Sequence, residues 1–99
     1  MVKKILLTYD INIKQTEVKN AMKLKGYFET IKKGSEIKSY TLPNTTLWKK
    51  GEELKTEIVL KELQDVTETL NRNVIASNKI KLEKAMAVEF TNWNAIDNY

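Results

Sequence analysis

The chain has 99 residues, 41% of them hydrophobic and 30% charged, which is enough for one hydrophobic core and predicts a single domain over residues 1–99. It contains neither Cys nor His, and this excludes disulfides, thiolate nucleophiles, Ser-His-Asp hydrolysis and His-based metal sites. The net charge of +4 is uneven, since residues 1–50 carry 11 Lys against 4 acids and residues 51–99 carry 6 basic residues against 9 acids. A phosphate-binding face, complementary subunit contacts or solubility alone would each account for this distribution.

The N-terminal segment predicts a buried strand. Residues 4–9 form a short apolar run bounded by charge, as in a central strand covered on both faces, and Asp10 follows at its carboxyl end. The apolar run ends at Leu7, too soon for a signal-peptide core, and no stretch of the sequence approaches the length of a membrane span. We therefore expect a cytoplasmic protein with no membrane partner.

A helix is expected from about Lys14 to Lys25, with Gly26 after it as the C′ residue. Three polar residues near its start are candidate N-caps, namely Asp10, Asn12 and Thr16. The apolar side of this helix would face the core, whereas Lys19 and Lys23, four residues apart, would lie on an exposed basic side.

A hairpin is predicted next. Residues 27–32 alternate as a strand does, Gly34-Ser35 suits a turn, and residues 37–42 return as β-prone sequence. Pro43 interrupts the ladder because it has no N–H, and residues 45–49 resume in a strand-like run. The third strand of the fold is therefore residues 37–42, residues 45–49 or a bent union of both.

The second helix is expected to run from Gly51, as its N-cap, to about Leu70. Its main apolar stripe would consist of Val59, Leu63, Val66 and Leu70. Leu54 and Ile58 lie well around such a helix from that stripe. These two residues would therefore need another burial partner, such as a loop or a second subunit.

The C-terminal part completes the predicted topology. Residues 74–76 are either a short strand or a continuation of the helix, and residues 84–90 are the last strong strand candidate. The order β-α-β-β-α-β predicts an α+β, ferredoxin-like fold, in which an antiparallel sheet carries both helices on one face. Such a sheet has exposed edges and one bare face, and dimerisation would cover either.

Several short motifs resemble the Cas2 superfamily, which includes VapD and the SinR-like proteins. The first motif is an apolar strand ending in Tyr9-Asp10-Ile11, followed by a helix and Gly26-Tyr27. Residues 42–48, Leu-Pro-Asn-Thr-Thr-Leu-Trp, are similar to the Ser/Thr-plus-aromatic strand of SinR-like members. Residues 85–88 followed by Trp93 are similar to their final strand and the aromatic residue after it. The predicted order of helices and strands resembles the family over the whole chain, whereas the amino-acid sequence resembles it only in these short motifs.

The resemblance implies a homodimer that is associated with nucleic acid, related both to metal-dependent nucleases and to the structural Cas2 subunits of spacer integration. In the nuclease members, the Asp after the first strand lies near its dimer mate, so Asp10 becomes the candidate catalytic residue and the candidate metal ligand. Two carboxylates across a two-fold axis suit Mg²⁺, which takes oxygen ligands and keeps several waters. Such an ion polarises a phosphodiester and activates water for endoribonuclease or endodeoxyribonuclease chemistry.

Ordinary structural roles compete with these assignments. A carboxylate at a strand end is commonly a cap that accepts free backbone N–H groups, and this is the role that we favour for Asp10. Trp48 also has two interpretations. It would line a groove with Thr45 and Thr46 and stack on a base, or it would be buried in the core between the sheet and the helices. We favour the burial of Trp48.

The basic residues have the same two interpretations. The candidate phosphate contacts are Lys19, Lys23, Lys32, Lys33, Lys49 and Lys50. They would make binding of nucleic acid depend steeply on salt, or they would only keep the protein soluble. Residues 1–50 contain no Arg, which makes bidentate recognition of phosphates or bases a weaker expectation.

Two classes of function follow. The first is a Cas2-like nucleic-acid-associated homodimer, with Mg²⁺-dependent nuclease activity at Asp10. The alternative is a non-catalytic protein-interaction module, a dimeric adaptor or inhibitor that uses the sheet edges and the C-terminal residues Trp93, Ile96 and Tyr99. A small-molecule enzyme ranks third, because the sequence has no phosphate-binding Gly loop, dinucleotide fingerprint or nucleophile motif.

Overall fold

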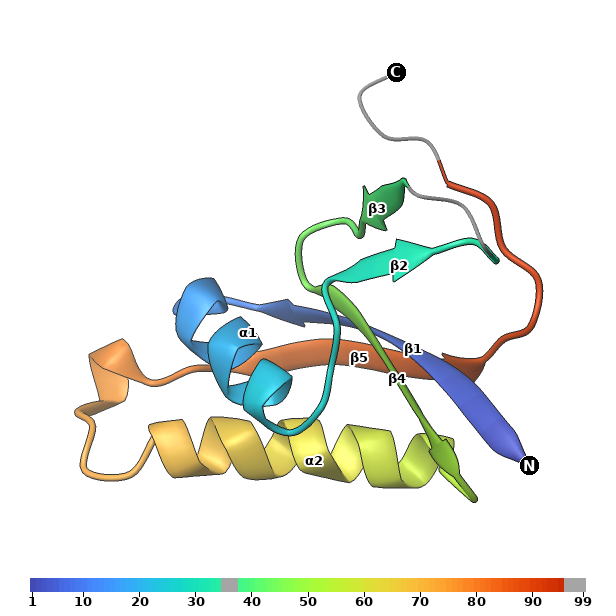
Figure 1. Cartoon of the computed structure of the whole chain (residues 1–99). Coiled ribbons are helices and arrows are strands. Elements are labelled where there is room, and N and C mark those ends of the chain that lie inside the picture. The colour runs from blue at the N-terminus through green and yellow to red at the C-terminus, as the bar shows by residue number, and fades with distance from the viewer. Residues whose placement is uncertain (35–37, 96–99) are drawn as a thin grey trace.

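The computed structural model describes residues 1–34 and 38–95 of an α+β protein (Figure 1). Its elements in chain order are β1 (Val2–Ile11), α1 (Gln15–Leu24), β2 (Thr30–Lys32), β3 (Ser39–Thr41), β4 (Thr46–Glu52), α2 (Thr56–Leu70), the 3-10 turn η1 (Ala76–Asn78) and β5 (Leu82–Glu89). Within the described ranges, no helix is long and apolar enough to cross a membrane.

The strands form two sheets. The main sheet has the order β4-β1-β5, and β1 pairs antiparallel with both neighbours, which confirms the prediction of a central first strand. The predicted hairpin is present as a separate two-stranded sheet, β2-β3, with the register Thr30 to Thr41. It contacts the main sheet through an antiparallel bridge in which the backbones of Phe28 and Trp48 exchange hydrogen bonds of 2.8 and 3.1 Å. Ser35 and Ile37 of the predicted hairpin lie outside the described residues.

The run after Pro43, rather than the one before it, supplies the strand that pairs with β1. Thr46 to Glu52 form β4 and align with Thr8 to Val2, whereas Ser39 to Thr41 pair with β2. The two runs are separated by a turn in which the Thr46 N–H donates to the Pro43 carbonyl at 3.0 Å, and Thr45 has a φ of 61°. A bent union of the two runs is thereby excluded.

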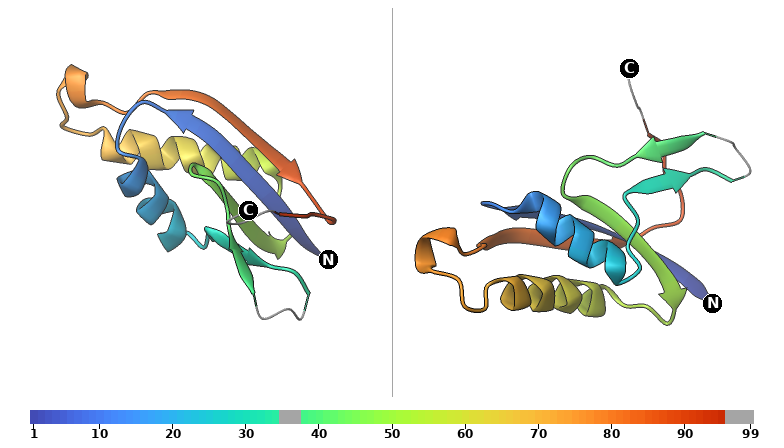
Figure 2. Two further views of the ribbon diagram at one scale, coloured as in Figure 1. Left: turned by 90° about the horizontal axis from the view of Figure 1, so that it is seen from above. Right: turned by 60° about the vertical axis from the view of Figure 1, so that its left-hand side comes forward.

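Helices α1 and α2 cover one face of the main sheet, and the β2-β3 hairpin lies on the other side (Figures 1 and 2). The core lies between sheet and helices and includes Ile5, Leu7, Tyr9, Ile11, Val18, Met22, Leu47, Val59, Leu63 and Val66. Because side chains alternate along a strand, the even-numbered residues of β1 point away from the helices. We call this second side of the main sheet the open face.

Helix α1 begins without the side-chain caps that the sequence predicts. Its N-cap is Lys14, with a φ of 61° and no side-chain cap, so the predictions for Asp10, Asn12 and Thr16 are wrong. Asn12 instead holds the chain before β5, donating to the Lys79 carbonyl at 3.2 Å and accepting from the Lys81 N–H at 2.6 Å. These partners are distant in the sequence, and a local capping rule does not include them.

The end of α1 is as predicted. Gly26 has a φ of 97° and donates to the Lys23 carbonyl, and Tyr27 donates to the Met22 carbonyl. These two bonds form a Schellman motif, which requires the left-handed conformation that Gly adopts at little cost. The motif turns the chain so that Tyr27 enters the core, where it is 2% exposed.

Helix α2 begins at Thr56, not at Gly51, so the predicted N-cap is wrong. Gly51 and Glu52 belong to β4, where they pair with Lys3 and Val2. Cross-strand pairing with β1 thus overrides the local helix signal. Leu54 precedes the helix and is buried in the monomer core, which removes the predicted need for another partner, whereas Ile58 is exposed.

After α2, a polar clamp directs the chain back to the sheet. The Asn71 side chain donates to the Ile80 carbonyl at 2.9 Å and accepts from the Ile80 N–H at 2.8 Å. Between these residues the chain forms the turn η1, so residues 74–76 are neither a strand nor a continuation of α2. The last strand, β5, spans residues 82–89 and confirms the predicted strand at 84–90 to within two residues.

Candidate functional site

Asp10 lies within β1 on the open face, near the end of the strand. It is exposed, and its carboxylate makes no hydrogen bond or ion pair with a described residue. The capping role that we favoured from the sequence is therefore wrong, because the strand continues to Ile11 and α1 begins further on. Asp10 is a free carboxylate on the surface of a rigid strand.

The surroundings of Asp10 are mixed in charge. Its direct cross-strand neighbour is Lys84, and both residues line a shallow cavity of about 280 Å³ with Thr8 and Met86. No group of three or more Asp or Glu side chains that would hold a metal ion occurs within residues 1–34 and 38–95. One copy of the chain thus offers one carboxylate at this position.

An apolar strip runs along the open face beside Asp10, and we define it as Leu6, Met86 and Val88. Leu6 pairs directly with Val88, and Met86 is opposite Thr8, two register positions nearer to Asp10. Met86 is 62% exposed and Val88 is 42% exposed, although both belong to strand β5. Strand β5 is also an edge strand of the main sheet, so its outer edge has no neighbouring strand among the described residues.

Trp48 lies on the open face and not in the core, which contradicts the burial that we favoured. Leu47 is the fully buried neighbour, and Trp48 pairs with Leu6 in the register. The Trp48 ring contacts Phe28 at a centroid distance of 5.2 Å and Phe90 at 6.1 Å, and its Nε1–H donates to the Thr30 carbonyl at 2.7 Å. We call Phe28, Trp48 and Phe90 the aromatic cluster.

Two of the candidate phosphate contacts are already paired with an acid. Lys23 donates to Glu29 at 2.7 Å, and Lys19 lies 3.8 Å from the same carboxylate and 3.3 Å from the Asn44 amide oxygen. The hydrogen bond from Lys23, with the charges of both Lys, lowers the pKa of Glu29. The exposed side of α1 is thereby partly neutralised.

Lys49 belongs to a second network, on the helix side of β4. Its Nζ lies 3.0 and 3.2 Å from the Glu62 oxygens and 5.0 Å from the centre of the Tyr27 ring. The Tyr27 hydroxyl donates to Glu62 at 2.8 Å, and burial, together with this bond, raises the pKa of Tyr27 far above its usual range. This partly buried triad joins β4 to α2, and its phenol stays protonated at neutral pH.

The remaining basic candidates are available on the surface. Lys50 lies directly opposite Lys4, and neither makes an ion pair with a described residue. Two like charges at one cross-strand position repel each other, so an anion at this place would relieve the repulsion. Lys32 is exposed, and Lys33 donates to the Asn94 amide oxygen at 2.7 Å and lies 5.9 Å from the centre of the Trp93 ring.

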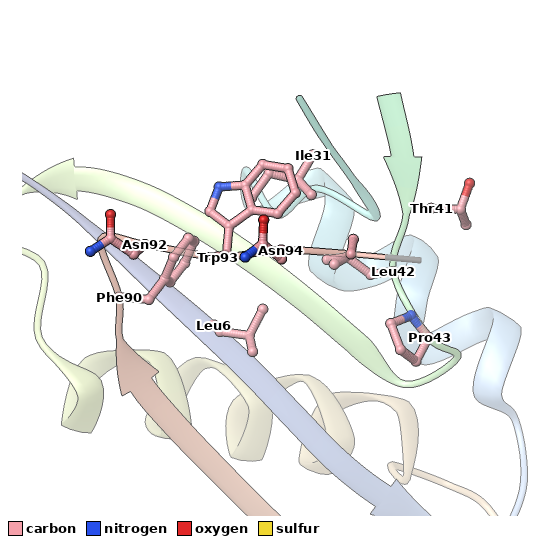
Figure 3. A pocket seen from close by; sticks show the side chains of 10 residues that line it. Leu6, Ile31, Thr41, Leu42, Pro43, Phe90, Asn92, Trp93 and Asn94 are labelled. Carbon is pink, nitrogen blue, oxygen red and sulfur yellow. The ribbon is translucent and has the colours of Figure 1, made fainter. Parts of the chain in front are cut away.

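A larger cavity, which the sequence did not predict, lies between the open face, the hairpin and the segment after β5 (Figure 3). Its volume is about 410 Å³, and we call it the hairpin cavity. Its lining comprises Leu6, Ile31, Thr41, Leu42, Pro43, Phe90, Asn92, Trp93, Asn94 and Ala95. Trp93 was noted as a candidate contact, and it is held edge-on to Tyr40 at a centroid distance of 5.7 Å, whereas Ile96 and Tyr99 lie outside the described residues.

The surfaces of interest therefore share one side of the molecule. Asp10, the apolar strip, the aromatic cluster and the opposed Lys4 and Lys50 all lie on the open face, and the hairpin cavity adjoins them. Comparison of the chain with protein-family models, with curated proteins and with solved structures finds no match.

Proposed function

We propose that the chain is a Cas2-like, nucleic-acid-associated homodimer whose open face carries both the dimer contact and the nucleic-acid contact. The observation that carries the proposal is an exposed, unpaired carboxylate, Asp10, beside an exposed apolar strip on a rigid sheet. A ferredoxin-like relationship is supported by the antiparallel order β4-β1-β5, by two helices on one face, and by the bridge that brings Phe28 to the outer edge of β4.

The homodimer is supported by the exposure of the apolar strip. Large apolar side chains that cluster on the face of a sheet are unfavourable to leave in water, and a second copy would bury them. A two-fold axis near Met86 would also bring the two Asp10 side chains to the same region of the interface. The free outer edge of β5 offers backbone N–H and C=O groups that a neighbouring strand would pair.

Magnesium is the cofactor that this arrangement fits. Two exposed carboxylates, one from each copy, supply hard oxygen ligands and leave room for the waters that Mg²⁺ retains. Lys84, opposite Asp10 in the register, opposes cation binding, so we expect weak binding of the metal without nucleic acid. When bound, the ion would polarise a phosphodiester and lower the pKa of a bound water.

Nucleic acid is the partner that the rest of the open face fits. Lys4 and Lys50 present two adjacent positive charges without an acidic partner among the described residues, which suits a phosphate. The aromatic cluster next to them provides a surface on which bases stack. Lys19, Lys23 and Lys49, which are engaged with Glu29 and Glu62, would contribute less to phosphate binding.

Cleavage of labelled RNA and DNA, with and without Mg²⁺ or Mn²⁺, tests the catalytic part of the proposal. We expect metal-dependent cleavage by the wild-type protein and its loss in Asp10→Ala, with Asp65→Ala as a matched control on the outer side of α2. Because Asp10 has no partner among the described residues, the Asp10→Ala protein should fold normally, which thermal unfolding checks. Equal cleavage by Asp10→Ala and the wild type would eliminate Asp10 as the catalytic residue.

A non-catalytic protein-interaction module is the alternative, and one observation favours it. Asp10 is not part of a carboxylate cluster among the described residues, and it lies beside a larger apolar strip and a free strand edge, which also suits a protein partner. A dimer that neither binds nor cleaves nucleic acid at low salt would favour this alternative. In that case Met86→Asp should abolish association while Asp10→Ala leaves it unchanged.

A further inference from the structure

The hairpin cavity is built from three segments that are far apart in the sequence. Leu6 comes from β1 of the main sheet, Ile31 and the run from Thr41 to Pro43 come from the hairpin side, and Phe90 and residues 92–95 close it as the chain leaves β5 (Figure 3). Its volume of about 410 Å³ falls in the range of sites for small organic ligands.

The walls are apolar and the polar groups are few. Ile31, Leu42 and Phe90 supply apolar surface, and the Trp93 indole adds a large flat one. Asn92 makes no hydrogen bond with a described residue, so its amide offers both a donor and an acceptor. The Asn94 oxygen accepts from Lys33, which leaves its NH₂ group free to donate.

The positive charge of Lys33 beside the hairpin cavity disfavours the binding of cations. No acidic side chain lines the cavity within the described residues, and Lys33 is fixed beside it by Asn94 and the Trp93 ring. A ligand with a flat apolar body, donors and acceptors along its edge, and an anionic group attached would match all three features. A nucleobase carrying a phosphate has this chemistry, since bases stack on aromatic rings and pair with side-chain amides.

We propose that the hairpin cavity binds a nucleobase, with Trp93 in contact with the base, the Asn92 amide on its edge and Lys33 near its phosphate. The base comes from a free nucleotide or from a single-stranded nucleic acid. The second source rests on the function proposed above, whereas the first does not. Neither source requires Asp10, a metal ion, or the Met86 and Val88 side chains of the apolar strip.

Calorimetric titration of the whole chain with the four nucleoside 5′-monophosphates and with short single-stranded oligonucleotides tests this proposal. We expect at least one base to bind, and Trp93→Leu to weaken binding about tenfold or more, the usual scale for one stacked base. Asn92→Ala should weaken the preferred base more than the others. Ile58→Ala, a change at an exposed apolar residue outside both the cavity lining and the aromatic cluster, and Asn78→Ala are the matched controls.

The outcomes separate the two sources. Binding of monophosphates that Trp93→Leu weakens would support a free-nucleotide site, and binding of oligonucleotides alone with the same sensitivity would support a base within a strand. The proposal is overturned if neither ligand binds, or if Trp93→Leu and Asn92→Ala bind as the wild type does. If oligonucleotide binding is lost in Lys50→Glu but unaffected by both cavity variants, the cavity proposal fails while the proposed function stands.

Discussion

Replacing Tyr9 by Phe should stabilise the protein. The Tyr9 side chain is 4% exposed in the core, and its hydroxyl has no hydrogen-bond partner among the described residues. A buried hydroxyl without a partner costs about 1–3 kcal/mol, and Phe keeps the ring while removing that group. We expect the free energy of unfolding to rise by about 1–2 kcal/mol, or roughly 4–8 °C in melting temperature for each kcal/mol.

The dependence of stability on alkaline pH provides a second test of Tyr9. Burial raises the pKa of Tyr9 from 10.0 to about 12, so between these values the folded state binds more protons than the unfolded state. The stability linked to Tyr9 is therefore fully present below pH 10 and is lost as the pH rises through 12. Tyr9→Phe should lose less stability over this interval than the wild type.

Tyr27→Phe is the matched control, because Tyr27 is equally buried but its hydroxyl donates to the Glu62 carboxylate at 2.8 Å. Loss of a hydrogen bond to a charged group should destabilise the protein by about 1.5–3 kcal/mol. Urea unfolding at pH 7, followed by circular dichroism, measures both variants. If Tyr9→Phe is destabilised as much as Tyr27→Phe, the account of the Tyr9 hydroxyl as unpartnered is refuted.

Three further changes test other parts of the structure. Met86→Asp should weaken self-association by about 100-fold or more, measured by light scattering, because it places a charge in the apolar strip; unchanged association would exclude that interface. Asn71→Ala should cost about 2 kcal/mol in urea unfolding, since it removes both bonds to Ile80, and a neutral result would mean that the clamp is dispensable. Gly26→Ala should cost about 1–2 kcal/mol because of its φ of 97°, unlike the control Gly51→Ala.

The elements with strong local patterns were predictable from the sequence. The central strand β1 contains a continuous apolar run, α1 is amphipathic and followed by Gly26, and β5 contains the apolar run 85–88. The start of α2 was not predictable in this way. Glu52 is a residue type that is common at helix N-termini, yet it belongs to β4 and pairs with Val2 of β1. That pairing depends on a strand 50 positions earlier in the sequence, which a local pattern does not include.

The side to which Trp48 points illustrates a different limit. Leu47 and Trp48 are adjacent and both are large and apolar, so the local pattern does not decide which one enters the core. The register with β1 decides it, because Leu47 is opposite Leu7 and Trp48 is opposite Leu6. A shift of one residue in this register would have buried Trp48.

The candidate site was predictable in part. The position of Asp10 at the end of the first strand followed from the apolar run before it, but its lack of a capping role depended on where β1 ends. The engagement of Lys19 and Lys23 with Glu29, and of Lys49 with Glu62, required the packing of elements distant in the sequence. The hairpin cavity combines three such segments, and residues 91–95 have no periodic pattern that would indicate it.

Sedimentation velocity of the protein with a labelled single-stranded oligonucleotide, at low and high salt, tests the central claim most directly. We predict that the labelled strand sediments with two copies of the chain at low salt, and that the complex dissociates as salt rises. Lys50→Glu should weaken the complex without dissociating the dimer. A protein that stays monomeric and leaves the labelled strand free at low salt would contradict the account.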